Sequence, residues 1–369
     1  MSIPVFDSRA QIASLWSRLR QAIDEVMRSG HFVNGPNVRA FEEEVAAYLG
    51  LKYAVGVNSG TDALVIALRS LGVGPGDEVI TTPWTFFATA EAVSLVGATP
   101  VFVDIDPATY TLDPGLVERA VGARTRAILP VHLYGHSADL GPLRDIADRN
   151  NLVLVEDVAQ AFGGRYRGGL LGTVGDVGAF SFYPTKILGG FGDGGLVATS
   201  DARVAETARM LCSHGAKDPY LNETIGYNSR LDEIQAAILR VKLERVESWV
   251  EARRSVARRY AELLGGTDGI VLPYEAEFAR HVYHQYTIRI LGGRRDYVRK
   301  TLAQAGIETR VYYPVPLHHL PPYRNLGYRL LEAERAAGEV LSLPMWPELG
   351  PEHQARVAEV LNKAVGRSS

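Results

Sequence analysis

Cysteine is almost absent from the sequence. The 369 residues contain a single cysteine, Cys212, which excludes an intrachain disulfide and a cysteine-rich zinc site. No Cys-His signature surrounds Cys212, so we expect it to be a small buried hydrophobic residue rather than a nucleophile. We expect no metal site.

Long apolar runs and a strong excess of charge are missing as well. No apolar run reaches the ~20 residues that a membrane-spanning helix needs, and the segment from Met1 to Arg20 lacks the apolar core and cleavage site of a secretory signal. We therefore expect a cytoplasmic protein without a membrane partner. The formal net charge of −3 argues against nucleic acid as a partner, because binders of nucleic acid are strongly basic.

Short apolar runs alternate with helical patterns between residues 52 and 200. We expect strands at Tyr53–Val57, Glu78–Thr82, Thr99–Val103, Ala127–Pro130, Leu152–Val155, Gly178–Phe182 and Gly195–Thr199. Helical spacing fills most of the gaps, at Asp62–Leu71, Phe87–Val96, Pro114–Val121 and Ala138–Arg149. This alternation predicts an α/β fold of three layers, a mostly parallel sheet with helices on both faces. The last two strands lack a helix between them, so one edge is expected to be antiparallel.

The pattern changes after Asp201, and the chain exceeds the length that one hydrophobic core supports. We predict a large domain over residues 1–240 and a smaller C-terminal α+β domain over 241–369. The elements expected after Asp201 are helices around Leu231–Val241, Val246–Leu264, Tyr297–Ala305 and His353–Ala364, and strands at His284–Ile290 and Glu308–Val311. The arginine-rich stretch from Arg240 to Arg259 is interleaved with glutamates, which predicts a solvated helix face.

The segment from Asn58 to Leu64 suits a phosphate group. A strand ends there in a small polar turn, and a helix follows. The free N–H groups of the helix start attract anions, Gly60 allows close approach, and Thr61 adds a hydroxyl. A plain Ser/Thr helix cap explains the same residues equally well.

Two carboxylates, Glu156 and Asp157, follow the apolar run Leu152–Val155. They stand at the carboxyl end of a central strand, where ligands bind in open α/β sheets. A buried carboxylate needs a partner, and a protonated pyridine nitrogen is a suitable one. Because side chains alternate along a strand, Glu156 is expected to point to the opposite face. One of the two acids could merely cap the next turn.

Lys186 and Trp84 also follow strands. Lys186 precedes a loop with five glycines between residues 189 and 195, and its apolar setting suits a Schiff-base nucleophile with a lowered pKa. Trp84 could stack on a planar cofactor, although a ring at a strand end is more often part of the core. A phosphate site, a carboxylate, a ring and a lysine are together what pyridoxal phosphate (PLP) requires.

The segment Gly72-Val73-Gly74-Pro75-Gly76 superficially resembles a dinucleotide fingerprint. It follows a helix and precedes a strand, whereas the fingerprint needs the reverse order. A nicotinamide-dependent sugar-nucleotide oxidoreductase is therefore the disfavoured alternative from a different class of enzyme.

Several longer motifs resemble the PLP-dependent sugar aminotransferases of the DegT/DnrJ/EryC1/StrS family, which have the aspartate aminotransferase fold (PLP fold type I). The resemblance covers almost the entire chain. It is carried by Asn58-Ser59-Gly60-Thr61-Asp62-Ala63-Leu64, Pro130-Val131-His132-Leu133-Tyr134-Gly135, Glu156-Asp157-Val158-Ala159-Gln160-Ala161, Ser181-Phe182-Tyr183-Pro184-Thr185-Lys186, Gly192-Asp193-Gly194-Gly195 and Asn228-Ser229-Arg230-Leu231-Asp232.

The resemblance implies a role for each matching position. Lys186 would form the internal aldimine with PLP, Asp157 would pair with the pyridine nitrogen, and Gln160 would contact the ring hydroxyl oxygen. The remaining cofactor contacts would come from Gly60, Thr61 and Ser181 around the phosphate, Trp84 on the ring, and Asn228 at the phosphate site of the neighbouring subunit. The last contact implies a homodimer with shared sites. The residues near the sugar nucleotide would be Arg230, Tyr313 and His318.

The resemblance also implies the reaction. Relatives with histidine in place of the lysine are sugar dehydratases, so Lys186 favours transamination over dehydration. The expected reaction converts a UDP- or dTDP-linked keto sugar to the amino sugar, with L-glutamate as donor, in the biosynthesis of polysaccharide or antibiotic sugars. The motifs around Lys186 resemble the branch of the family that aminates C3, and a 4-keto sugar is the alternative substrate. A regulatory relative that binds PLP without turnover is disfavoured by the intact Lys186 and Asp157.

Overall fold

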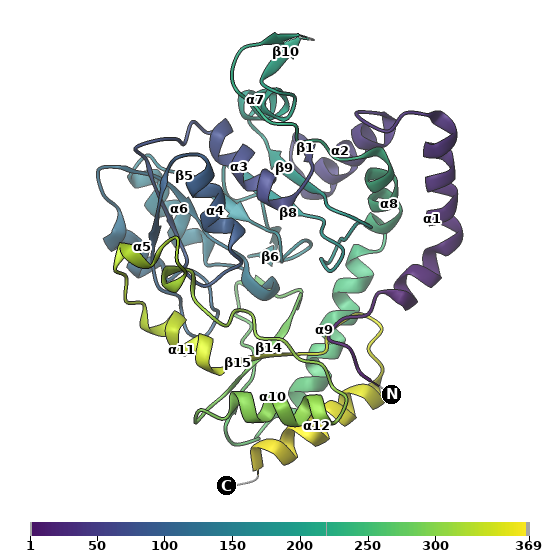
Figure 1. Ribbon diagram of the computed structural model, residues 1–369, viewed down its shortest axis with the longest axis vertical. Helices are drawn as coiled ribbons and strands as arrows, with labels where there is room; N and C mark the ends of the chain where they lie inside the picture. Colours follow the sequence, from purple (N-terminus) through teal and green to yellow (C-terminus); the bar gives the residue numbers. More distant parts are fainter. Residues whose placement is uncertain (1, 219, 367–369) are drawn as a thin grey trace.

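The computed structural model describes residues 2–218 and 220–366. A large α/β body occupies the upper part of Figure 1, and the C-terminal helices form a smaller region below it. The helices are α1 (Arg9–Ser29), α2 (Pro36–Leu49), α3 (Gly60–Ser70), α4 (Ala88–Leu95), α5 (Pro114–Ala120), α6 (Leu140–Arg149), α7 (Ala202–Cys212), α8 (Glu233–Leu243), α9 (Val246–Leu264), α10 (Arg295–Gln304), α11 (Leu331–Glu339) and α12 (Pro351–Gly366), with short 3-10 turns at Leu133–Gly135, Leu317–His319 and Arg324–Leu326.

Seven strands form the central sheet in the order β1-β9-β8-β5-β4-β2-β3. These strands are β1 (Tyr53–Val57), β2 (Glu78–Thr81), β3 (Thr99–Phe102), β4 (Thr125–Leu129), β5 (Val153–Asp157), β8 (Val177–Ser181) and β9 (Gly195–Thr199). Five neighbouring strands, from β8 to β3, are parallel, whereas β9 is antiparallel to both β8 and β1. The mostly parallel sheet is confirmed, but the antiparallel strand lies one position inside the edge rather than at it.

Alternate residues of the strands enter two different hydrophobic cores. Leu154 of β5 packs with α2, α5 and α6 on one face of the sheet, and its neighbour Val155 packs with α3, α4 and α7 on the other. Near-continuous apolar runs are the consequence of burial on both faces. They made all seven strands predictable to within two residues, and the three layers are as expected.

A smaller sheet organises the C-terminal region. It contains β12 (Ile270–Val271), β14 (Tyr286–Ile290) and β15 (Val340–Leu343), and α9, α10 and α12 pack on it. Ile3 belongs to this core too, since its N–H donates to the Gly306 carbonyl at 2.8 Å. The first residues thus pack with the C-terminal elements, and the division of the chain at residue 240 stays a prediction. The expected strand Glu308–Val311 is reduced to an isolated bridge between Arg310 and Ser342.

The remaining strands are short and were not predicted from sequence. They are β6 (Arg165–Tyr166), β7 (Gly169–Leu170), β10 (Ala216–Asp218), β11 (Leu221–Asn222) and β13 (Ala279–Arg280). The β10–β11 hairpin projects from the body at the top of Figure 1. It carries exposed apolar side chains, among them Tyr220 with 98% of its surface exposed.

The expectation of a solvated arginine-rich face is wrong for two of its members. Arg253 is buried and its Nη1 donates to the Tyr283 carbonyl at 3.1 Å. Lys242 is buried as well, with its Nζ bonded to the Gly189 carbonyl. Helix α8 packs against α1 and α2, and α9 runs from the upper body to the lower region of Figure 1, so this part of their surface faces protein rather than water. Cys212 is buried, as expected. Within residues 2–218 and 220–366, the structure contains no helix with the length and apolar character needed to cross a membrane.

Candidate active site

The predicted cofactor residues gather at one edge of the central sheet. Gly60 follows β1, Trp84 follows β2, Asp157 ends β5, and Ser181 ends β8. Strand β9 is antiparallel to both of its neighbours, so β1 runs in the same direction as β8 and the other strands. All of these residues therefore lie at the shared carboxyl edge, which is the ligand-binding edge of α/β sheets.

Asp157 is buried on the face of the sheet that α3 and α4 cover. The Thr89 hydroxyl donates to its Oδ2 at 2.9 Å, and the Ala159 N–H donates to its Oδ1 at 3.1 Å. Burial raises the pKa of the Asp157 carboxyl, while these two hydrogen bonds and the charge of Lys186 act in the opposite direction. A buried carboxylate in this balance gains from a cationic partner.

Glu156, the preceding residue, serves the opposite face. Its two oxygens accept the N–H groups of Gly172, Val174 and Gly175 at 2.6–2.8 Å. The His132 Nε2 contacts Oε2 at 2.9 Å, and the Ala138 N–H donates to His132 Nδ1 at 3.1 Å. Because Nδ1 accepts, the proton of a neutral His132 lies on Nε2, which donates to Glu156. Glu156 is thus an anchor for the turn at residues 172–175.

Lys186 begins the glycine-rich loop between β8 and β9. Burial lowers the pKa of its amine to about 8, and the negative charge of Asp157 opposes that shift. The charge of Lys186, together with burial, lowers the pKa of the neighbouring His284. Burial thus increases the fraction of neutral amine near physiological pH, and the neutral amine is the form that attacks a carbonyl group.

Glycines make the predicted phosphate cradle compact. A Cβ atom on Gly60 would lie 2.6 Å from the Cβ of Ser181, and one on Gly195 would lie 2.3 Å from the Ser59 carbonyl oxygen. Only glycine permits these approaches. The Ser59 side chain caps α3 by accepting the Asp62 N–H at 3.1 Å, so the helix cap and the cradle exist together. The start of α3 therefore lies against the strand end that carries Ser181, and the N–H groups at a helix start attract anions.

Trp84 and Gln160 are held by a common tyrosine. Trp84 is fully buried, and its Nε1 donates to the Tyr134 hydroxyl at 3.2 Å. The Tyr134 N–H donates to Gln160 Oε1 at 2.9 Å, and Gln160 Nε2 donates to the Tyr313 hydroxyl at 3.0 Å. This orientation leaves Gln160 Nε2 with a second N–H, a donor that suits a phenolic oxygen. Tyr313 therefore joins the predicted cofactor residues through Gln160.

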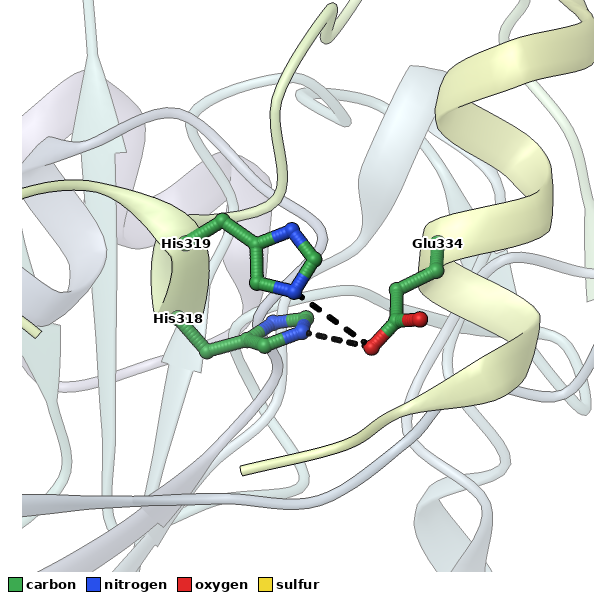
Figure 2. A group of neighbouring side chains, drawn as sticks. All are labelled: His318, His319 and Glu334. Carbon is green, nitrogen blue, oxygen red and sulfur yellow. Dashed lines mark hydrogen bonds and ion pairs between the residues drawn. The ribbon is translucent and has the colours of Figure 1, made fainter. Parts of the chain in front are cut away.

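The remaining predicted residues lie in different surroundings. Asn228 is exposed, and Arg230 is partly buried two residues beyond it. The intervening Ser229 accepts the Asn58 N–H at 3.3 Å, which ties this segment to the turn before Gly60. His318 is buried, and its Nε2 faces Glu334 at 3.1 Å (Figure 2). That contact is directed at α11 and not at the group around Lys186.

The sequence analysis assigned no role to three residues that contact this site. Thr89 belongs to the first turn of α4 and reaches Asp157. His284 is buried near Lys186 with its Nδ1 lacking a hydrogen-bond partner among the described residues. Tyr134 organises Trp84 and Gln160, and its position inside the motif Pro130–Gly135 was the available clue.

The residues present fit PLP. Asp157 offers a buried carboxylate for the pyridine nitrogen, Gln160 an N–H for the ring hydroxyl, and Lys186 an amine for the aldehyde. The glycine-lined start of α3 accommodates a phosphate group. Trp84 contributes an aromatic wall, and its ring meets Tyr313 edge-on at 6.4 Å.

Comparison with known proteins yields one consistent family. The sequence model of the DegT/DnrJ/EryC1/StrS aminotransferase family matches residues 14–362. A protein from Geobacillus stearothermophilus named "Pleiotropic regulatory protein" is 49% identical, over 97% of this chain and 97% of its own. The dTDP-3-amino-3,4,6-trideoxy-alpha-D-glucose transaminase of Streptomyces venezuelae is 48% identical, over 98% of this chain and 96% of its own. The crystal structure of S. venezuelae DesV in complex with a ketimine intermediate has a TM-score of 0.97 at 47% identity, and the match covers 100% of both chains.

Proposed function

Because the chain belongs to the DegT/DnrJ/EryC1/StrS aminotransferase family and is a PLP-dependent transaminase, we propose that it aminates C3 of a nucleotide-linked 3-keto sugar. The observation that carries the proposal is the approach of Lys186 and Asp157 at the carboxyl edge of the sheet. Each alters the pKa of the other through its charge. A lysine and a carboxylate so placed are the two groups that this chemistry requires.

When bound, PLP supplies an electron sink for the carbon that loses its proton. Lys186 Nζ would hold the cofactor through its aldehyde carbon and, as a free amine, would take up and return a proton at the substrate carbon. An amine with a pKa of about 8 both takes up and returns a proton near neutral pH. Asp157, oriented by Thr89 and Ala159, keeps the pyridine nitrogen protonated.

Substrate identity follows from the relatives and from the loop after Lys186. One relative is named for a dTDP-linked 3-amino sugar and another as a 3-aminotransferase of a UDP-linked 3-dehydro sugar, which supports C3 as the position and dTDP or UDP as the nucleotide. Gly192-Asp193-Gly194-Gly195 lies at the start of β9, directly beside Gly60. The shape of this loop therefore limits how a sugar approaches Lys186. A 4-keto sugar remains the alternative substrate.

We further propose that L-glutamate is the amino donor and that the protein is cytoplasmic. We also propose a homodimer in which the two subunits share their sites. The β10–β11 hairpin and the segment behind it expose Tyr220, Leu221 and Ile225. Apolar side chains exposed together are typical of protein interfaces. Asn228 follows this segment and is exposed, so a second subunit could contact its side chain.

Borohydride reduction followed by peptide mapping tests the assignment of the lysine. We expect the phosphopyridoxyl label on Lys186. Lys242 is the informative alternative, because burial lowers its pKa to about 8 as well. A label on Lys242 or on another lysine contradicts the proposal, whereas Lys242→Met should still carry the label on Lys186.

Product analysis tests the substrate. Purified enzyme is incubated with glutamate and one keto sugar at a time. The sugars are 3-keto and 4-keto sugars linked to dTDP or to UDP, and the products are identified by NMR. We expect a 3-amino sugar. Exclusive formation of a 4-amino sugar would show that the loop motif misled us. No turnover of any sugar, with the label on Lys186 intact, would favour the regulatory alternative that the name of the Geobacillus relative suggests.

A further inference from the structure

Three side chains converge beside the large domain, outside the group around Lys186. His318 and His319 come from the 3-10 turn Leu317–His319, and Glu334 comes from the first turn of α11. Figure 2 shows both imidazole rings directed at the same carboxylate. His318 Nε2 lies 3.1 Å and His319 Nε2 lies 3.5 Å from Glu334 Oε1. One ligand atom from each residue lies within 4.8 Å of the other two.

This arrangement crowds a single oxygen atom. Glu334 Oε1 also accepts the Leu330 N–H at 3.0 Å, so three nitrogen atoms approach it. A carboxylate oxygen has two lone pairs, so it cannot accept three good hydrogen bonds. The contact with His319 Nε2, at 3.5 Å, is the longest of the three. The two distances of 3.1 and 3.5 Å lie close to those of a tetrahedral metal site, in which bonds of about 2.0–2.2 Å place neighbouring ligand atoms about 3.3–3.6 Å apart.

The surroundings suit a bound cation that water can reach. His318 is buried beside Leu317, which packs in an apolar cluster with Phe102 and Tyr323. His319 and Glu334 are 48% and 28% exposed, so the opposite side is open to solvent. His318 Nδ1 has no hydrogen-bond partner among the described residues, so the contacts of this ring nitrogen pair are those that Nε2 makes with Glu334.

We propose that His318, His319 and Glu334 bind a divalent transition-metal ion such as zinc, with water as the fourth ligand. Two imidazoles and one carboxylate are a ligand set that zinc accepts. The site differs from our expectation of no metal, since that expectation rested on cysteine content. It also differs from the role near the sugar nucleotide that the family resemblance implies for His318. The proposal does not depend on the reaction catalysed at Lys186.

A bound ion would join two segments that border the active site. The Leu317 N–H donates to the Pro83 carbonyl at 2.8 Å, and Pro83 precedes Trp84. Ala333 of α11 packs in the same cluster as Trp84 and Tyr134. The ion would therefore hold the turn Leu317–His319 against α11 behind the wall formed by Trp84. We therefore propose a structural role for the ion and not a catalytic one.

Calorimetric titration of the untagged, chelator-treated holoenzyme with ZnCl₂ tests the site. We expect one zinc ion per chain. His319→Ala removes an exposed ligand that the fold does not need, and Glu334→Gln keeps an oxygen for the Leu330 N–H while removing the charge. Both should weaken zinc binding at least about tenfold, since changes even outside the ligand shell commonly cost 10- to 100-fold.

His31→Ala is the matched control, because His31 is an exposed histidine at the end of α1. It should leave zinc affinity unchanged, and all the proteins carry the same PLP, so zinc bound by the cofactor cancels in the comparison. Absence of zinc binding to the parent protein would overturn the proposal. Equal affinity in His319→Ala and the parent would overturn it as well, and would leave the cluster as a helix cap with a hydrogen-bonded histidine.

Discussion

Glu156 and Asp157 are consecutive in β5, and their carboxylates serve opposite faces of the sheet. Glu156 lies on the same face of the sheet as Leu154, the face that α2, α5 and α6 cover. There it accepts three backbone N–H groups and faces His132. Asp157 lies on the side of α4, where Thr89 reaches it. One acid therefore fixes a turn, and the other is presented to a ligand.

Exchanging each acid for its amide should separate the two roles. Asp157→Asn should lower kcat by two orders of magnitude or more, since loss of a key electrostatic group costs about 3 kcal/mol in the transition state. Without cofactor its free energy of unfolding should be unchanged or higher, because burial raises the pKa of Asp157 and a neutral amide avoids that cost. Steady-state kinetics and urea denaturation of the cofactor-free protein provide the measurements.

Glu156→Gln should show the reverse pattern. Its amide nitrogen would face N–H donors, and an unsatisfied buried group costs about 1–3 kcal/mol. We expect a lower free energy of unfolding and a smaller loss of kcat than in Asp157→Asn. If Glu156→Gln proves the more damaging to kcat, our assignment of the carboxylate that faces the cofactor is wrong.

Cofactor capture by the cofactor-free protein should depend on pH. Only the neutral amine of Lys186 attacks an aldehyde, and its pKa is about 8. The rate of PLP incorporation, followed by its visible absorbance, should rise about tenfold per pH unit below pH 8 and level off above it. A rise that continues toward pH 10 would mean that the amine is solvated. Asp157→Asn removes the charge that supports the ammonium form, so its midpoint should move to lower pH.

Local patterns explain why the elements that carry these residues were predictable, while the roles of the residues stay predictions. The strand ends at Gly60, Trp84, Asp157 and Ser181 follow from apolar runs, and residues at the ends of parallel strands must meet. The positions of Lys242 and Arg253 did not follow, because α8 and α9 carry charges at a spacing that is also typical of solvated helices. Their burial depends on contacts with residues that are distant in the sequence, such as Gly189 for Lys242 and Tyr283 for Arg253. A pattern within a short stretch of sequence does not include those partners.

The hydrogen bonds between distant segments could not be predicted from local sequence patterns either. Glu156 binds the turn at residues 172–175, and Tyr134 links Trp84 to Gln160 across three separate segments. Motifs located these residues but did not assign their partners. The strands of the β10–β11 hairpin, of three and two residues, are too short to leave a period-two signal.

Lys242 should make stability depend on alkaline pH. Its pKa in the folded protein is about 8, lowered by burial from 10.5, so between these values the unfolded chain holds a proton that the folded protein lacks. Stability should therefore rise with pH across this window, by up to about 1.4 kcal/mol per pH unit. Lys242→Met should remove that contribution. Urea denaturation at pH 8, 9 and 10 measures it, and Lys300→Met, at an exposed lysine, should behave as the parent protein does.

Asn228 should act across a dimer. Lys186→Ala and Asn228→Ala subunits, each inactive or nearly so alone, are mixed under conditions that permit subunit exchange. If Asn228 serves the partner's site, one site of each hybrid combines an intact Lys186 with an intact Asn228, and up to about a quarter of the activity should return in a two-fold symmetric dimer. The chain itself poses the alternative, because Ser229 is bonded to Asn58 beside the same subunit's Gly60. If Asn228 serves that nearer site, every hybrid site carries one defect. Absence of complementation, with exchange verified by mass spectrometry of differently tagged subunits, would therefore assign Asn228 to its own subunit.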